Sequence, residues 1–106
     1  MADQVRASHI LLMYAGSERS TATRSKDEAL QQINTLKDAI ADGADFGELA
    51  RENSDCPSGR DGGDLGSFGR GMMVPEFDTA VFAMEVGDTS DVVETAFGYH
   101  LIQRTE

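Results

Sequence analysis

The sequence predicts a single α+β domain with an antiparallel sheet. Its 106 residues, 1–106, are close to the commonest size of one domain. The predicted elements follow the order strand, helix, helix, short helix, strand, helix, strand, strand, and we expect the last two strands to form a hairpin. Consecutive strands that are too closely spaced for a βαβ layout favour an antiparallel sheet.

The first strand is predicted from the alternation of residues Val5 to Met13. His9 lies in the middle of this strand, on a face that is otherwise apolar. Taken alone, His9 is most simply interpreted as a core histidine that is hydrogen-bonded to the backbone. The small, polar residues 15–24 follow as a loop that is longer than most connections in compact domains, and such loops are often functional.

Two helices are predicted after this loop. Ser25 and Glu28 form a capping-box pattern that starts the first helix, and Gly43 supplies its stop. Asp45 is a good N-cap for a second, short helix over residues Phe46 to Glu52.

The second half of the chain supplies the remaining strands and one more helix. Asp64 to Phe68 is predicted as a short strand between glycines, and Pro75 suits the first turn of a helix. Val92-Val93 is predicted as a short strand, with a turn over residues 94–97. Gly98 to Arg104 is the final strand, with His100 on the same face as Ile102.

The glycine-rich stretch from Ser54 to Phe77 contains the only cysteine, Cys56, and more than half of the chain's eleven glycines. Lone apolar side chains lie between the glycines: Leu65, Phe68, Met72, Met73 and Val74. Glycine permits the tight turns that such a path needs. The stretch therefore predicts a few large apolar side chains held close to a thiol, as in many small binding sites.

The composition argues against several classes of partner. The formal net charge is −10, whereas nucleic-acid binding normally needs a basic face, and anionic membranes should repel this chain. The longest near-continuous apolar run, Ile10 to Tyr14, is far too short to span a membrane. One cysteine cannot form an intramolecular disulfide, and no apolar signal core follows Met1. We therefore expect a cytoplasmic protein that binds neither nucleic acid nor membrane.

Two histidines and one cysteine are the chain's candidates for reactive chemistry. A metal site of His9, Cys56 and His100 lacks the usual closely spaced ligand pairs. A Cys-His nucleophile pair would need an oxyanion hole and usually has a larger scaffold. The third interpretation is a hydrogen-bonded polar cluster at the floor of an apolar pocket. The residues alone do not separate this cluster from an inert core.

The chain resembles the parvulin family of peptidyl-prolyl cis/trans isomerases from about Val5 to Arg104. The matching segments, in order, are ASHILL, KDEALQQI, DFGELARENSDCPSG, GGDLGSFGRGMMVPEFDTAVF and FGYHLI. No single segment is decisive, but their order and spacing together are specific. The resemblance implies a four-stranded antiparallel sheet surrounded by about four helices, no cofactor and no metal.

The resemblance also implies the site residues. The catalytic polar cluster falls on His9, Cys56, Thr95 and His100. The walls of the proline-binding cleft fall on Leu65, Met73, Phe77 and Phe97. The substrates implied are proline-containing peptides or unfolded protein segments, and we expect the enzyme to act as a monomer.

Substrate choice is expected to depend on the loop after the first strand. Phosphate-directed parvulins carry a basic triad there, whereas the corresponding residues of this chain are Met13, Glu18 and Arg19. We therefore predict no strict dependence on phosphorylation, with Arg19 and Arg24 as possible contacts to an anion. The alternative function is a non-catalytic module, part of a chaperone, that binds proline-containing segments.

Overall fold

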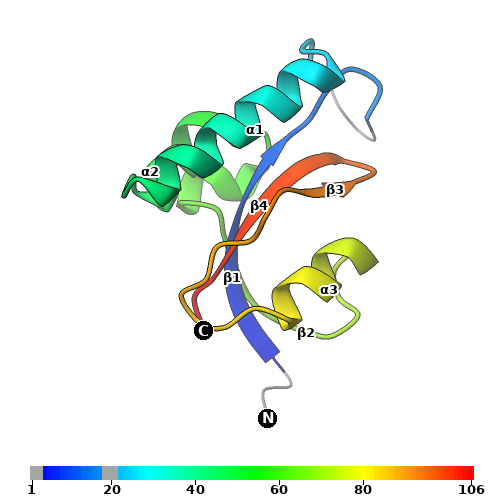
Figure 1. Cartoon of the computed structure of the whole chain (residues 1–106). Helices are drawn as coiled ribbons and strands as arrows, with labels where there is room; N and C mark the ends of the chain where they lie inside the picture. The colour runs from blue at the N-terminus through cyan, green and yellow to red at the C-terminus, as the bar shows by residue number, and fades with distance from the viewer. Residues whose placement is uncertain (1–3, 18–21) are drawn as a thin grey trace.

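A four-stranded antiparallel sheet forms the centre of the molecule within residues 4–17 and 22–106, which the computed structural model describes (Figure 1). The strands lie in the order β2–β1–β4–β3. Their bounds are β1 (Gln4–Leu12), β2 (Asp64–Gly69), β3 (Val93–Thr95) and β4 (Gly98–Arg104). The first and last strands of the chain, β1 and β4, therefore lie side by side in the middle of the sheet.

The described part of the chain also contains three α-helices and one short 3-10 helix. They are α1 (Lys26–Ala41), α2 (Phe46–Asn53), η1 (Pro57–Asp61) and α3 (Pro75–Phe82). The α+β class and the predicted order of elements are confirmed, with η1 as the predicted short helix. No helix in the described residues is long and apolar enough to cross a membrane.

The capping signals act as predicted at the start of α1. The Ser25 hydroxyl accepts a hydrogen bond from the Glu28 amide, and the Glu28 carboxylate accepts one from the Ser25 amide. Two N–H groups that have no partner within the helix are thereby satisfied.

One predicted boundary is wrong by more than a residue, at the hairpin between β3 and β4. The sequence predicts a turn over residues 94–97, but β3 continues to Thr95, which pairs with Gly98. The turn is therefore confined to Ala96 and Phe97. This shorter turn places Thr95 in the sheet, diagonally opposite His100.

The sheet separates two apolar clusters, because alternate side chains of β1 and β4 point to opposite faces. Ile10, Leu12, Tyr99 and Leu101 pack with α1 and α2 in one cluster. Val5, Ala7 and Ile102 pack with Phe77 and Val81 of α3 in the other. His9 and His100 have the strand parity of the second group, so they face α3.

The chain between α2 and β2 is fastened to the edge of β1 that β4 leaves free. The Asp55 amide donates to the Leu11 carbonyl at 2.7 Å, and the His9 amide donates to the Gly63 carbonyl at 2.9 Å. These two attachments hold the intervening segment, which contains Cys56 and η1, beside His9.

Gly63 makes the second attachment possible. Its φ is +85°, and a Cβ atom there would lie 2.2 Å from the His9 carbonyl oxygen. Only glycine fits this close approach of two backbones.

Candidate active site

The two histidines face each other across the central pair of strands. His9 pairs with Ile102 and His100 pairs with Leu11, so the two rings are diagonal neighbours on one face of the sheet. Their Nδ1 atoms are 3.2 Å apart, within hydrogen-bond distance. The rings are nearly parallel, with centroids 5.4 Å apart. The pairing of β1 with β4 thus brings two residues of the expected polar cluster together.

Both imidazoles are uncharged at neutral pH. Burial lowers the pKa of His9 from 6.5 to about 4. Burial, with a smaller contribution from neighbouring His9, lowers the pKa of His100 to about 3. Each neutral ring has one N–H donor and one lone-pair acceptor, so the pair shares a single proton between the facing Nδ1 atoms.

Thr95 holds the far side of His100. Its Oγ1 lies 2.8 Å from His100 Nε2, and the same oxygen accepts a hydrogen bond from the Phe97 amide at 3.2 Å. Thr95 is buried, with 5% of its surface exposed. Because its neighbour in the turn fixes the Thr95 hydroxyl, the ring of His100 has a defined orientation.

Cys56 joins this arrangement through Ser58. The Ser58 hydroxyl donates to Cys56 Sγ at 3.2 Å, and the Ser58 oxygen lies 3.2 Å from His9 Nε2. The thiol is free and half-buried. Thr95, His100, His9, Ser58 and Cys56 therefore form one continuous hydrogen-bonded chain, which we call the polar chain.

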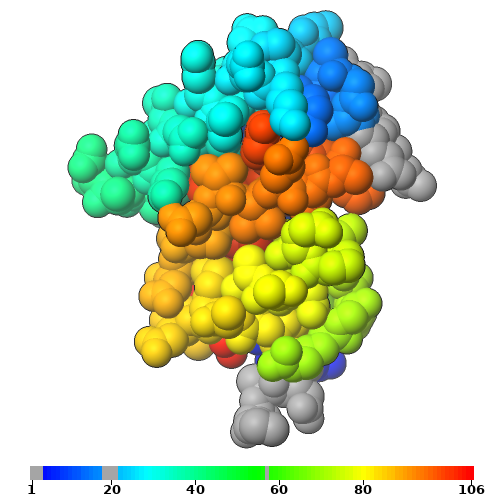
Figure 2. Space-filling model, turned by 45° about the vertical axis from the view of Figure 1, so that its right-hand side comes forward, coloured from blue at the N-terminus to red at the C-terminus, as the bar shows by residue number. Residues whose placement is uncertain are grey.

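Phe77 forms the apolar wall of the polar chain. Its ring contacts both histidine rings edge to face, with centroid distances of 5.7 Å to His9 and 5.7 Å to His100. Leu65 and Met73 are half-buried and pack against the same apolar cluster as Phe77. In Figure 2, α3 (yellow) lies against the orange segment that leads into β3.

Phe97 and Arg24 have contacts that the sequence did not predict. Phe97 is half-buried, and its amide bonds Thr95. Arg24 donates through Nη1 to the Met13 carbonyl and to the Asp55 carboxylate. The Asp55 carboxylate also accepts from the Met13 amide at 2.8 Å. The Arg24 charge is thus compensated inside the protein, and Arg19 lies outside the described residues.

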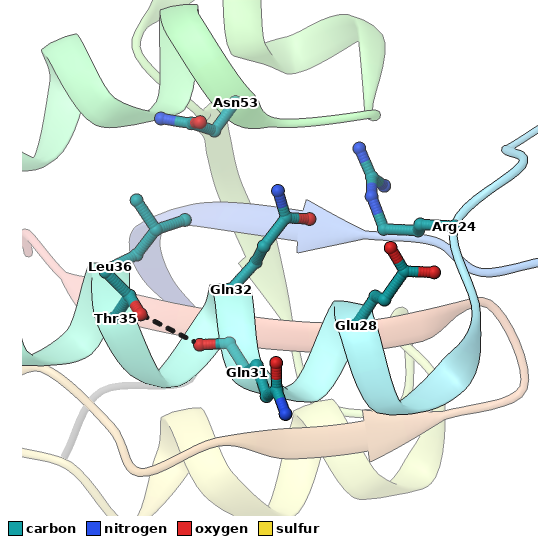
Figure 3. A pocket seen from close by; sticks show the side chains of 7 residues that line it. All are labelled: Arg24, Glu28, Gln31, Gln32, Thr35, Leu36 and Asn53. Carbon is teal, nitrogen blue, oxygen red and sulfur yellow. Dashed lines mark hydrogen bonds between the residues drawn. The ribbon is translucent and has the colours of Figure 1, made fainter.

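A hollow lies between α1 and α2, away from the histidines (Figure 3). Gln32 and Leu36 of α1 point toward Asn53 of α2, and Arg24 lies at one end. The hollow has no histidine or thiol, and its lining consists of three amides, a paired guanidinium, a carboxylate, a hydroxyl and one leucine: Gln31, Gln32, Asn53, Arg24, Glu28, Thr35 and Leu36. The histidines and the thiol of the protein are therefore all found in the polar chain.

The contacts of Ser58 and of its neighbours Ser54 and Asp55 were not predicted from the sequence. Ser54 Oγ accepts from the Leu11 amide at 3.1 Å and from the Cys56 amide at 3.4 Å. Ser58 stands two residues after Cys56 in a Pro-Ser-Gly turn, which is a sequence signal for a turn and not for a contact with a distant histidine. Only the fold brings it to His9.

The arrangement suits a reaction that needs no charged group. Its polar atoms pair with one another, its rings are neutral, and an aromatic wall adjoins them. No buried side-chain nitrogen or oxygen among the described residues lacks a hydrogen-bond partner. Such a site can bind a polar bond and surround it with fixed dipoles in an environment poor in water.

Comparisons with known proteins extend over nearly the whole chain. The family described as PPIC-type PPIASE domain matches residues 1–106. The peptidyl-prolyl cis-trans isomerase Pin1 of Arabidopsis thaliana is 44% identical over 114 residues, covering 97% of this chain and 96% of that protein. The peptidyl-prolyl isomerase ESS1 from Candida albicans has a TM-score of 0.91 and 37% identity, covering 98% of this chain and 63% of that one. The solution structure of TbPIN1 has a TM-score of 0.92 and 36% identity, covering 100% of both chains.

Proposed function

The chain belongs to the family of PPIC-type peptidyl-prolyl cis/trans isomerases, and we propose that the polar chain and the wall at Phe77 form its active site. Isomerisation of peptidyl-prolyl bonds is the enzyme's reaction. The observation that carries the proposed site is that one aromatic side chain, Phe77, contacts both neutral histidine rings. An apolar surface for a proline ring thus adjoins hydrogen-bonding groups for the amide.

The reaction requires stabilisation of a twisted amide. The X-Pro bond turns over a barrier of about 18–20 kcal/mol, because resonance holds the amide planar. Twisting removes the conjugation and makes the amide less polar, so an apolar site with little water favours the twisted form over both planar forms. An acceleration of about 10⁴-fold requires about 5.5 kcal/mol of preferential binding.

Each site residue has a role in this proposal. Leu65, Met73 and Phe77 hold the proline ring, and Phe97 forms a further wall of the cleft. His9, Cys56, Thr95 and His100 lie beside the rotating bond and keep its surroundings polar but uncharged. No bond to the protein forms, so the mechanism is non-covalent and uses no cofactor.

A matched pair of methionine variants tests the proline-binding wall. Met73→Ala should lower kcat/KM about tenfold to hundredfold, the usual effect of losing apolar contact in a substrate pocket. Met72→Ala is the control, because Met72 is adjacent in sequence but 70% exposed. Equal losses of kcat/KM in the two variants would contradict the role of Met73 in the proline-binding wall. A His9→Leu variant that keeps its turnover would contradict the role of His9 in the active site.

We also propose that the substrates do not need a phosphate group before proline. Met13 stands where phosphate-directed members of the family carry a basic residue. The Arg24 guanidinium is already paired with Asp55 in the described structure. Serine-proline, glutamate-proline and phosphoserine-proline peptides should therefore be isomerised at rates within about tenfold of each other. A phosphopeptide that reacts faster than this would contradict the proposal.

We also propose that the enzyme is a monomer and that it lies in the cytoplasm. Among the described residues, the exposed large apolar side chains Leu30, Met72 and Val86 lie on three different segments, which supports a monomer. A free thiol in the site fits a reducing compartment, which supports a cytoplasmic enzyme acting on peptides and folding proteins. Light scattering and cell fractionation measure the two properties.

A further inference from the structure

We propose that the hollow between α1 and α2 is a second binding site for the client, which holds a segment of main chain that flanks the isomerised X-Pro bond. This inference rests on the proposed function, because the flank reaches the hollow from a client that is bound at the active site. It goes further by assigning a ligand to a surface away from the histidines. It also makes long, unfolded segments better substrates than short peptides.

The hollow has the dimensions of a short extended segment. Its volume is about 430 Å³, which is in the range of ligand sites. Glu28, Gln32 and Leu36 stand four residues apart along α1, so their side chains form one row. Asn53 of α2 lies opposite this row (Figure 3). The row is roughly 12 Å long at about 1.5 Å per helical residue, and an extended chain of about four residues covers the same length.

The free hydrogen-bonding groups of the hollow suit a main chain. The side-chain amide of Gln32 has no hydrogen-bond partner among the described residues. Asn53 donates through Nδ2 to the Leu49 carbonyl at 3.0 Å, and its Oδ1 has no partner among the described residues. A side-chain amide offers both donors and an acceptor, as each peptide unit does. Gln32 and Asn53 can therefore pair with the N–H and C=O groups of a client of any sequence.

The charges at one end of the hollow favour neither acidic nor basic side chains. Arg24 is paired with Asp55, and Glu28, of opposite charge, lies close to Arg24 in Figure 3. Leu36 is half-buried and supplies an apolar contact. A lining of this kind selects for main chain, which all unfolded segments share, and not for a charged motif.

A short path connects the active site to the hollow around the free edge of β1. Cys56 belongs to the proposed active site, and the residue before it, Asp55, donates its amide to the Leu11 carbonyl at 2.7 Å. The Asp55 carboxylate is paired with Arg24, which lines the hollow. A client chain that leaves the active site past Cys56 and Asp55 therefore meets Arg24 next.

The connection to the active site makes weak contacts in the hollow sufficient. A client that is bound at the active site holds its own flank near the hollow at an effective concentration on the order of millimolar. A few hydrogen bonds can then retain the flank although they would not capture a free peptide. These contacts are the same for the planar and the twisted amide, so they lower KM and leave kcat as it is.

Isomerisation kinetics with peptides of graded length test the inference. The peptides are a four-residue leucine-proline peptide and two versions extended by about six alanine and serine residues, one before and one after the original sequence. Six extended residues span roughly 20 Å. With the wild-type enzyme, at least one extended peptide should have a KM about fivefold lower than the short peptide at the same kcat, the effect of one net hydrogen bond.

Two variants of α1 form a matched pair for this measurement. Gln32→Ala should abolish the advantage of the extended peptide, because the variant lacks the free amide of the hollow. Asn34→Ala is the control and should keep the advantage, since Asn34 is an exposed amide on the same helix outside the hollow. In ¹H–¹⁵N spectra of the wild-type protein, the side-chain NH₂ signals of Gln32 and Asn53 should shift with the extended peptide and not with the short one.

Two results would overturn the inference. One is an equal KM for all three peptides with the wild-type enzyme, and the other is an advantage of the extended peptide that Gln32→Ala retains. The measurements also separate this inference from the proposed function. An active enzyme without the length effect contradicts only the second site. Shifts of the Gln32 signals in a protein that isomerises none of the peptides contradict only the proposed function.

Discussion

At the scale of single residues, His9 and His100 differ from most histidines because burial keeps both rings neutral well below pH 6.5, where an ordinary histidine becomes charged. Each ring makes one hydrogen bond through each nitrogen: to the other ring, and to Ser58 or Thr95. The rings therefore serve as oriented dipoles. A role as proton donor or acceptor in a rate-limiting step would call for a pKa nearer the working pH.

Cys56 gives the most direct residue-scale prediction. Its sulfur accepts a hydrogen bond at the end of the polar chain, and a serine oxygen accepts such a bond as well. Cys56→Ser should therefore lower kcat by about fivefold, the effect of weakening an interaction by about 1 kcal/mol. Steady-state isomerisation of a proline peptide measures this change.

A covalent mechanism gives a different result for the same substitution. Removal of a true nucleophile lowers kcat by on the order of 10⁴-fold or more. A Cys56→Ser enzyme with no detectable turnover but a native fold would contradict the non-covalent account. Cys56→Asp is a useful second variant, because retention of most of its activity with an acid in place of the thiol would also argue against a nucleophile.

At the scale of elements, the site is assembled around one stretch of β1, with β3 joined to it through β4. β4 brings His100 to one edge of the strand, and the segment before β2 brings Ser58 to the other. β3 carries Thr95, and α3 closes the face with Phe77. The position of the serine therefore depends on the turn that joins η1 to β2.

A substitution at Gly63 tests how the site depends on the turn that joins η1 to β2. Gly63→Ala should destabilise the fold by clearly more than the cost of a positive φ alone, which is about 1–3 kcal/mol. The added Cβ would lie 2.2 Å from the His9 carbonyl oxygen, so β1 and the turn must move apart. Urea unfolding measures the free energy of unfolding.

Gly66→Ala is the matched control for Gly63→Ala. Its φ is +72°, but a Cβ at that position meets nothing within 4 Å. Gly66→Ala should show the backbone cost without the clash, and it should leave the histidine signals unchanged. Equal destabilisation by the two variants would show that the approach of Gly63 to His9 is not important.

The sequence predicted most elements because their signals are local. The capping box at Ser25, the strand alternation around His9 and the proline at position 75 each act within a few residues. The end of β3 was misplaced because Thr95 is fixed by pairing with Gly98 across the hairpin. Tertiary pairing decided that boundary, and local preference did not.

The site was predictable to the extent that the family resemblance covered it. His9, His100 and Thr95, which the resemblance implied, are hydrogen-bonded in sequence, and Phe77 lies against the rings, while their catalytic role stays a prediction. Ser58 was missed because its partner His9 is 49 residues away in the chain. The pairing of Arg24 with Asp55 was missed for the same reason. Contacts between irregular segments depend on the folded path of the chain and have no periodic signature.

At the scale of the whole molecule, the two buried histidines link folding to pH. Their pKa values are about 4 and about 3 in the folded protein, against 6.5 in the unfolded chain. Below pH 6.5 the unfolded chain therefore binds protons that the folded protein does not. The contribution of the histidines to the free energy of unfolding is therefore fully present above pH 6.5 and is lost as the pH drops toward 4.

The size of this loss is measurable. One unit of pKa difference is worth about 1.4 kcal/mol, so the loss by pH 4 should be on the order of a few kcal/mol. Urea unfolding should be compared between pH 7 and pH 5, because carboxylates contribute least to the pH dependence of the free energy of unfolding in this range. His9→Leu should show about half of the wild-type slope, because one of the two groups is gone. A wild-type stability that does not change between pH 7 and pH 5 would contradict the buried, neutral state of the rings.

The central claim is that this molecule accelerates rotation about X-Pro bonds without forming a bond to the substrate. The most direct measurement is exchange NMR of a leucine-proline peptide with a small amount of the wild-type protein. We predict cross-peaks between the cis and trans forms within the mixing time, whereas the uncatalysed interconversion takes tens to hundreds of seconds. If the peptide signals shift on binding but no exchange cross-peaks appear, the protein only binds proline segments, and the account of the polar chain as an active site is wrong.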